Sequence, residues 1–199
     1  MRVLIGCEFS GVVREAFRKR GHDAWSCDLL PAEDGSQNHY HAEHKWELDN
    51  LARSEPWDFG IFHPPCTFLS NSGVRWLYGG KGCNPDKIRW AHMREAATFF
   101  RALLNFPIPK IAIENPIQHR YAREIIGQSH SQIIQPWQFG HGETKATCLW
   151  LKGLPLLEPT NIVSGRMPRV HHASPGPDRW KERSRTYPGI AAAMAEQWG

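Results

Sequence analysis

Short apolar runs alternate with helix-like stretches along most of the chain, and this alternation sets the fold class. Residues 2–6, 23–27, 58–62, 110–114, 131–135 and 147–151 have the length and composition of buried strands. Residues 10–21, 88–106, 118–127 and 189–198 are typical of helices. Strands that alternate with helices form a mainly parallel sheet with helices on both faces. Because ligands of such sheets bind beyond the carboxyl ends of the strands, we expect the functional residues to follow the strands.

One domain, residues 1–199, is predicted, and the chain is long enough to bury a sizeable core. No apolar run approaches the roughly 20 residues that span a bilayer, and no signal-peptide pattern is present. We therefore expect a soluble cytoplasmic protein with no membrane partner. The five cysteines are odd in number and include no CxxC pair, which indicates free thiols rather than a disulfide framework.

Positive charge is concentrated late in the chain. Between Arg166 and Arg185, six Arg and Lys residues stand against two acidic residues, and this net charge of +4 equals that of the whole chain. The surrounding stretch is also rich in Pro, Gly and His. Such a segment suits a polyanionic partner, although a solvated basic loop would have the same composition. We interpret residues 152–187 as a short basic insert that contacts substrate.

The turn GCEFSG (6–11) joins the first predicted strand to the first predicted helix. Gly11 would let backbone amides approach a ligand, and Ser10 is the predicted N-cap. Asp28 ends the second strand, where the acidic residue of nucleotide-binding βαβ units accepts ribose hydroxyls. Strand–Gly–helix turns are common, so a purely structural turn stays open as an alternative.

The sequence HPPC (63–66) comes directly after the strand predicted at 58–62. Two consecutive prolines stiffen the backbone and remove two amide donors, so Cys66 is fixed at the edge of the sheet. Buried cysteines are usually small hydrophobes, which is how we interpret Cys27 and Cys148. A thiol held rigidly beyond a strand is better explained as a nucleophile.

Glu114, within AIENP (112–116), ends the strand predicted at 110–114 and lies beside the same pocket. An unpaired buried carboxylate is costly, so this group should be protonated or paired. A Glu with a raised pKa can donate a proton or a hydrogen bond at neutral pH. A helix N-cap or an ion pair would instead make Glu114 structural.

Four segments together resemble the DNA cytosine-C5 methyltransferases, and most closely the small phage- or prophage-type members. In order, FSG (9–11), PPC (64–66), ENP (114–116) and residues 187–198 resemble the family's cofactor loop, catalytic loop, Glu-Asn motif and late helix. The resemblance implies a Rossmann-like methyltransferase fold, a mainly parallel sheet with an antiparallel C-terminal hairpin. It also implies S-adenosylmethionine as cofactor, DNA as partner, and the cytoplasm of a bacterium or phage-infected cell.

The same resemblance implies a mechanism and its residues. Cys66 attacks C6 of cytosine, Glu114 holds the N3/N4 edge, and C5 takes the methyl group; a base in duplex DNA would have to be flipped out. The implied cofactor-binding residues are Cys7, Phe9, Ser10, Gly11, Asp28, Asp49 and Pro64. The candidate substrate-binding residues are Pro65, Asn115 and Lys145, with Arg166, Arg169, Arg179, Trp180 and Arg185 from the insert.

The chain departs from the family in two places. Residues 138–151 contain Lys145 as their only cation where the family has an Arg-rich motif, and a large target-recognition region is missing. These departures leave open a free pyrimidine nucleotide as substrate, transfer of a group other than methyl, and a non-catalytic binder of cofactor or DNA. An amino-methyltransferase is a further alternative, but such enzymes have Asp, Asn or Ser before Pro-Pro and an aromatic residue after it, where this chain has His63 and Cys66.

Two further patterns are interpreted as loops. His39, His41 and His44 lie close together, but without partner ligands they indicate a solvated polar loop and no metal site. The run Gly79–Gly82 follows the predicted catalytic loop and is interpreted either as a lid or as a plain surface loop.

Overall fold

A computed structural model describes residues 1–78, 84–172, 176 and 179–199. Within these residues one seven-stranded sheet has the order β3-β2-β1-β4-β5-β7-β6. Its strands are β1 (Arg2–Gly6), β2 (Asp23–Asp28), β3 (His39–His41), β4 (Phe59–Phe62), β5 (Lys110–Pro116), β6 (Gln132–Ile134) and β7 (Thr147–Lys152). The first five are parallel, and β7 is antiparallel to both of its neighbours. The predicted fold class is confirmed, while the lid at Gly79–Gly82 lies outside the described residues.

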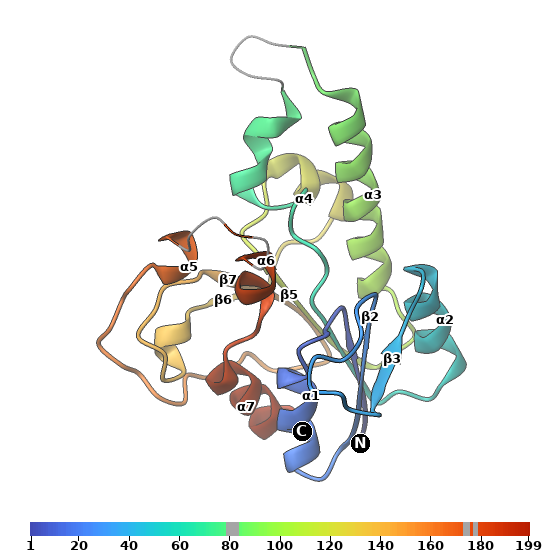
Figure 1. The fold of residues 1–199 in the computed structure, drawn as a ribbon, viewed down its shortest axis with the longest axis vertical. Coiled ribbons are helices and arrows are strands. Elements are labelled where there is room, and N and C mark those ends of the chain that lie inside the picture. Colours follow the sequence, from blue (N-terminus) through green and yellow to red (C-terminus); the bar gives the residue numbers. More distant parts are fainter. Residues whose placement is uncertain (79–83, 173–175, 177–178) are drawn as a thin grey trace.

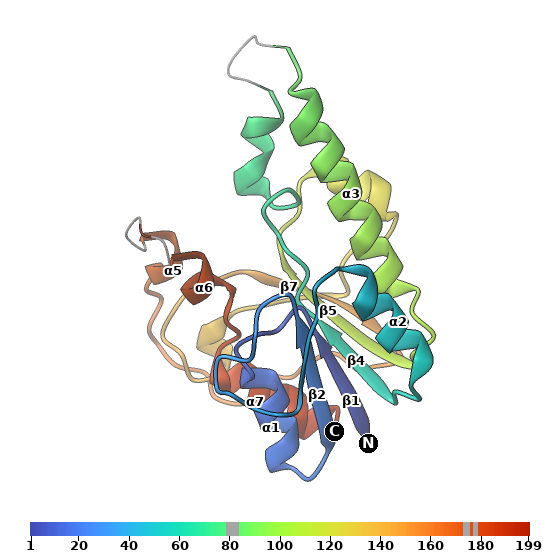
Figure 2. The same ribbon diagram turned by 45° about the vertical axis from the view of Figure 1, so that its right-hand side comes forward.

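Helices cover both faces of the sheet (Figures 1 and 2). The α-helices are α1 (Val12–Lys19), α2 (Trp46–Ser54), α3 (Lys87–Leu104), α4 (Arg120–Ile126), α5 (Arg169–His172), α6 (Arg179–Ser184) and α7 (Pro188–Gln197). Two 3₁₀ helices, η1 (Asn71–Leu77) and η2 (Pro136–Gln138), complete the set. None of the helices in the described ranges combines the length and hydropathy needed to cross a bilayer.

The core is divided by the sheet because successive strand residues point to opposite faces. Val3 and Ile5 of β1 cluster with Phe17 of α1 and Met194 of α7. Leu4, between them, belongs instead to the cluster that includes the buried side chains of α2, α3 and α4. Strands buried on both faces read as continuous apolar runs, which is why β1 and β4 were predictable.

The strand order reverses between β1 and β4. The chain runs outward from β1 to β2 and β3, then returns to β4 on the other side of β1. The turn at residues 6–11 and the loop at 63–66 therefore leave the carboxyl ends of the two central strands at the switch point. η1 and the N-terminal half of α3 project beyond this end of the sheet, away from α1 and α7 (Figures 1 and 2). We call this projection the arm.

Candidate active site

His63 and Glu114 form a buried pair at the carboxyl ends of β4 and β5. The imidazole Nδ1 lies 3.0 Å from Glu114 Oε2, and the two side chains are 10% and 11% exposed. The hydroxyl of Thr186, which follows α6, donates to the same oxygen at 3.2 Å. Adjacent parallel strands place the first two groups together, and the end of the basic insert supplies the third.

Glu114 is paired, which was one of its two expected states, and its pKa is lowered instead of raised. Burial alone raises the pKa of Glu114, but the hydrogen bond from His63 and the positive charge of Lys145 outweigh burial and lower it to about 2. Burial lowers the pKa of His63, but the hydrogen bond and charge of Glu114, with the charge of Glu8, raise it above its usual range. Glu114 is therefore an ionised acceptor, and its charge favours the protonated form of His63.

Cys66 lies in a tight turn just after the two prolines. Its carbonyl oxygen accepts hydrogen bonds from the amides of Leu69 and Ser70 at 3.0 and 2.9 Å. Burial raises the pKa of the Cys66 thiol, while the positive charges of Lys145 and Arg183 and its own backbone N–H act in the opposite direction. The thiol is thus protonated at rest, and Lys145 influences the same two groups, Cys66 and Glu114, that were predicted to be catalytic.

Asn115 joins the loop at residues 63–66 to β5. Its side-chain amide donates to the Pro64 carbonyl oxygen at 2.8 Å, and the residue is 2% exposed. A second connection runs from the His119 amide to the Leu69 carbonyl oxygen at 3.0 Å. These bonds fix the loop that holds Cys66 against β5, the strand that carries Glu114.

A cavity of about 200 Å³ lies beside this loop, at the ends of β1 and β2. Cys7, Asp28 and Pro65 line it together with apolar side chains that include Phe68 and Phe99. Asp28 is half-buried, accepts a hydrogen bond from the Leu30 amide at 2.9 Å, and has a pKa raised by burial. Two predicted cofactor residues and one predicted substrate residue therefore line the cavity.

The start of α1 differs from the predicted Ser10 cap. Gly11 occupies the N-cap position with φ 71°, and no side-chain hydrogen bond caps the helix from that residue. Instead the carboxylate of Glu8 accepts the amides of Val13 at 2.7 Å and Arg14 at 3.2 Å. Ser10 Oγ lies 3.5 Å from the Val12 nitrogen, a weaker contact. The sequence pattern favoured Ser10 because it is adjacent to the helix, whereas the longer Glu8 side chain folds back onto the amides.

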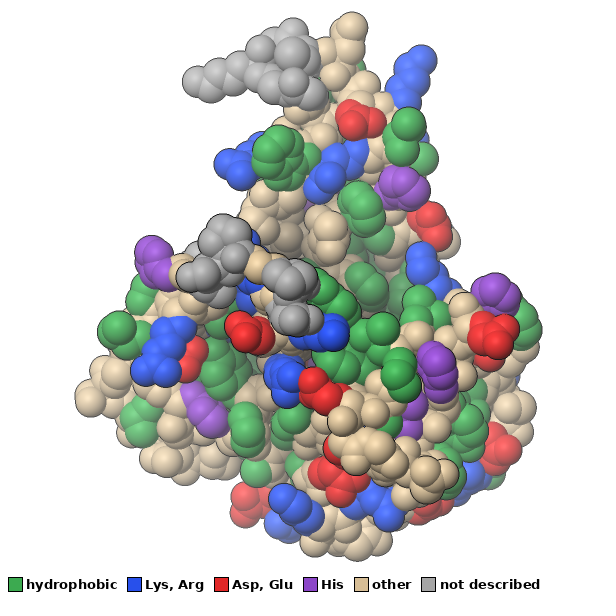
Figure 3. Space-filling model, viewed as in Figure 1, with side chains coloured by type: hydrophobic (Ala, Val, Ile, Leu, Met, Phe, Trp, Pro, Cys, Tyr) green, Lys and Arg blue, Asp and Glu red, His purple; other side chains and the backbone are tan. Residues whose placement is uncertain are grey.

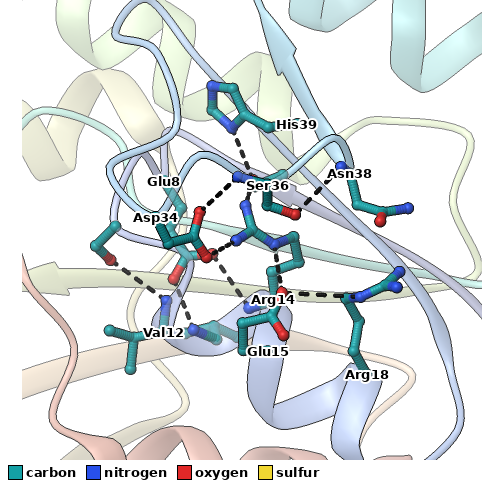
Figure 4. A network of polar contacts seen from close by, with 12 residues as sticks. Glu8, Val12, Arg14, Glu15, Arg18, Asp34, Ser36, Asn38 and His39 are labelled. Carbon is teal, nitrogen blue, oxygen red and sulfur yellow. Dashed lines mark hydrogen bonds and ion pairs between the residues drawn. The ribbon is translucent and has the colours of Figure 1, made fainter.

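Arg14 is fully buried and joins α1 to the segment that follows β2 (Figure 4). Its guanidinium donates to Ser26 Oγ at 2.8 Å, pairs with Glu15 at 3.0 Å and also pairs with Asp34. Sequence reasoning missed this residue, although a cation next to Val13 on the apolar face of a short helix was a usable signal. The network holds the loop beyond Asp28 in place.

The remaining predicted cofactor residues are not among those that line the cavity. Asp49 lies on α2 and pairs with Arg53 at 3.0 Å. Phe9 is buried, with its ring centroid 6.0 Å from that of Trp180. Pro64 contributes its carbonyl oxygen to Asn115. The roles of Asp49, Phe9 and Pro64 at a cofactor stay predictions.

The basic insert returns to the site through α6. Trp180 packs on Phe9 yet is 52% exposed, and Arg179 begins the same helix. Three further arginines of the insert are engaged elsewhere. Arg166 bonds the Gly165 carbonyl at 2.6 Å, Arg169 is 3.5 Å from Glu143, and Arg185 is 2.6 Å from Glu33.

The histidines at 39, 41 and 44 make separate contacts. His39 bonds Ser26 Oγ at 2.8 Å and the Leu30 carbonyl at 2.9 Å, and His41 bonds the Leu29 carbonyl at 3.1 Å. His44 stacks on Trp46. Across the described part of the chain, no three His, Cys, Asp or Glu side chains are grouped as a metal site would require.

Comparison with known proteins gives structural matches only. No protein-family model and no curated protein sequence matches the chain. A candidate DNA modification methyltransferase encoded within a prophage (E. coli) superposes with a TM-score of 0.50 at 14% identity, over 82% of this chain and 52% of that one. The Entamoeba histolytica methyltransferase EhMeth gives a TM-score of 0.50 at 15% identity, over 82% and 57%. The chain thus spans little more than half the length of these solved proteins, and what it shares with them is the methyltransferase fold.

Proposed function

We propose that this chain transfers a methyl group from S-adenosylmethionine to C5 of cytosine in DNA through a covalent bond between Cys66 and the base. One observation carries the proposal. Cys66 follows β4, Glu114 lies near the carboxyl end of the adjacent parallel strand β5, and the positive charge of Lys145 favours the ionised form of both side chains. C5 of cytosine is not nucleophilic unaided, so a thiolate that adds to C6 next to an acceptor for the amino group would divide the barrier into smaller steps.

The cavity beside Cys7 suits the nucleoside part of the proposed cofactor. Asp28 offers a half-buried carboxyl group to ribose hydroxyls, and Phe68 and Phe99 offer apolar walls to an adenine ring. Cys7 and Pro65 complete the side nearest to the catalytic loop. When bound, the cofactor would supply an electrophilic methyl group. Residues Ser10 and Gly11 would shape the turn next to it.

Cys66 acts on the base as a thiolate. Because burial raises the pKa of its thiol, the proton must leave before attack, and Lys145 and Arg183 stabilise the resulting negative charge. Glu114, which is ionised, accepts a hydrogen bond from the exocyclic amino group of cytosine. Asn115 holds the Pro64 carbonyl and so keeps the sulfur at a fixed distance from this carboxylate. After transfer, loss of the C5 proton would release Cys66.

A nucleic acid would meet cations and aromatic rings on two sides of the site. On the arm, Arg75 stacks 4.6 Å from the ring of Trp76, which is 54% exposed, and Arg89 stacks 5.1 Å from Phe68. On α6, Trp180 is half exposed and Arg183 acts on the Cys66 thiol. Lys and Arg side chains border a central hydrophobic area on this face of the molecule (Figure 3). Such surfaces bind phosphates and stack on bases.

Incubation with labelled S-adenosylmethionine and cytosine-containing DNA tests the proposal. We expect label at C5 of cytosine, and a covalent complex at Cys66 with an oligonucleotide that contains 5-fluorocytosine. Cys66→Ser should abolish the complex, whereas Cys148→Ala should retain it because Cys148 is buried in β7. Label on an exocyclic amine, or unchanged turnover by Cys66→Ser, would contradict the covalent mechanism. A parallel reaction with dCMP tests the free nucleotide as substrate.

A further inference from the structure

The backbone of His63 is fixed independently of its side chain. Its amide donates to the carbonyl oxygen of Gly6, the last residue of β1, at 3.0 Å. Pro64 and Pro65 follow and restrict the chain further. The imidazole is therefore held between the turn that carries Glu8 and the strand that carries Glu114. A smaller or apolar residue would satisfy the backbone equally well, so the imidazole itself needs another explanation.

The two carboxylate oxygens of Glu114 differ in their hydrogen bonds. His63 Nδ1 and Thr186 Oγ1 both bond to Oε2. No described residue is hydrogen-bonded to the other oxygen, Oε1. One side of the carboxylate is thus occupied by a donor with an exchangeable proton, and the other side is available to a substrate.

An ionised carboxylate can hydrogen-bond only one of the two polar groups on the N3/N4 edge of cytosine. It accepts a hydrogen bond from the amino group, but N3 is an acceptor and needs a donor. When sulfur adds to C6, the C5=C6 π pair moves to form C4=C5 and the C4=N3 π pair moves onto N3. N3 then needs a proton, which Glu114 in its resting form does not have.

We propose that His63 is the proton reservoir of the base pocket and acts through Glu114. The proton of His63 Nδ1 first passes to Glu114 Oε2; the carboxyl group then rotates so that its protonated oxygen faces the base. As the S–C6 bond forms, N3 takes this same proton. His63 ends neutral and Glu114 ends as a carboxylate, so charge and protons balance. The reverse transfer accompanies release of Cys66. This role rests on the proposed function and makes His63 a positioning residue for proton transfer.

The charges around His63 are consistent with this role. Glu114 and Glu8 favour its imidazolium, while Lys145 and burial disfavour it. Asp28, at the end of β2, also interacts electrostatically with His63. The carboxyl groups that act on His63 therefore come from the carboxyl ends of β1, β2 and β5. The one cation among these groups, Lys145, lies shortly before β7.

NMR titration of the free protein tests the resting state without substrate or cofactor. With ¹⁵N-labelled histidine, we expect His63 to be protonated at pH 7 in the wild type and to titrate at lower pH in Glu114→Gln. His119 is an internal control: its ring hydrogen-bonds only backbone groups, so its titration should be the same in both proteins. A neutral His63 at pH 6 in the wild type would overturn the reservoir.

Exchange of the cytosine C5 proton with deuterium, measured without a methyl donor, tests the transfer itself. His63→Asn keeps a donor near the position of Nδ1 but no titratable proton, and we expect exchange near pH 7 to fall about 100-fold or more. The exchange rate of the wild type should also decrease as the pH rises through the pKa of His63. The exchange rate of His63→Asn should not show this decrease. Slower exchange with an unchanged pH profile would overturn the relay but leave the proposed function intact. Absence of exchange in the wild type would overturn both.

Discussion

The side-chain amide of Asn115 donates to the carbonyl oxygen of Pro64 across 2.8 Å, in a position that is 2% exposed. This bond joins the end of β5 to the rigid turn before Cys66. It therefore fixes Cys66, the proposed nucleophile, relative to Glu114, which directly precedes Asn115.

Asn115→Ala should lower both stability and reactivity. The variant leaves the buried Pro64 carbonyl without a partner, which costs about 1–3 kcal/mol in the free energy of unfolding. The 5-fluorocytosine adduct should also form more slowly. Urea unfolding and adduct kinetics check these effects. Asn105→Ala is the control because the Asn105 amide also donates to a carbonyl, at 2.7 Å, but at the surface. Equal losses in the two variants would contradict a special role for Asn115.

The alkylation of Cys66 should depend on Lys145. Burial raises the pKa of the Cys66 thiol, so the thiolate fraction and the rate of reaction with iodoacetamide should increase as the pH rises. Lys145→Met removes an opposing positive charge and should shift the profile to higher pH. Mass spectrometry of the Cys66 peptide measures the rate. Lys19→Met, at the exposed end of α1, should leave the profile unchanged; an equal shift there would argue against a local effect.

Stability at low pH should report the His63–Glu114 pair. The pKa of Glu114 is lowered from 4.5 to about 2 in the folded chain, so its contribution is present above the unfolded value and is lost as the pH falls through this interval. Thermal unfolding between pH 4.5 and 2 should therefore show a steeper loss for the wild type than for Glu114→Gln. Parallel curves would mean that Glu114 is not ionised by its partners.

Asp28→Ala should weaken binding of S-adenosylmethionine by roughly 10- to 100-fold, the equivalent of one lost hydrogen bond to a charged group. Calorimetry with the cofactor alone measures this. Asp49→Ala provides the comparison because Asp49 was also predicted to bind the cofactor but pairs with Arg53 on α2. We expect the larger effect at Asp28, which lines the cavity. An unchanged dissociation constant for Asp28→Ala would exclude it as the ribose partner.

Trp180→Ala should weaken DNA binding by about 1–3 kcal/mol if its ring stacks on a base. Trp46→Ala is a matched control, since Trp46 is 59% exposed on α2 and Trp180 is 52% exposed on α6. Fluorescence anisotropy at several salt concentrations measures both. Arg183→Ala should reduce the salt dependence of binding if it contacts a phosphate. Equal affinity of the Trp180 and Trp46 variants would place the DNA elsewhere.

Much of the fold was predictable because its central strands are apolar on both faces. The run at 2–6 became β1 with the predicted bounds, and the helix predicted at 88–106 became α3 (Lys87–Leu104). β3 was missed because His39–His41 is three residues long and polar. α2 was missed because it buries only Leu48 and Ala52, too few for a clear helical period.

The candidate site was predictable where a motif fixes the backbone and not where partners come from distant segments. Cys66 and Glu114 stand in recognisable motifs at strand ends. The pairing of Glu114 with His63 depends on the register of β4 and β5, and the bond from Thr186 joins residues 72 positions apart. A raised pKa at Glu114 followed reasonably from burial alone, and only the partners reverse it.

The bonds from Glu8 to the first amides of α1 have a consequence for discrimination among nucleotides. Many nucleotide-binding folds present these amides to phosphate groups. Here Glu8 already occupies two of them, so a diphosphate would have to displace a carboxyl group from its own chain. Coenzymes with a diphosphate or triphosphate, such as NAD or ATP, are thus disfavoured at the carboxyl end of β1. A nucleoside that carries a sulfonium charge and no phosphate would not have to displace Glu8.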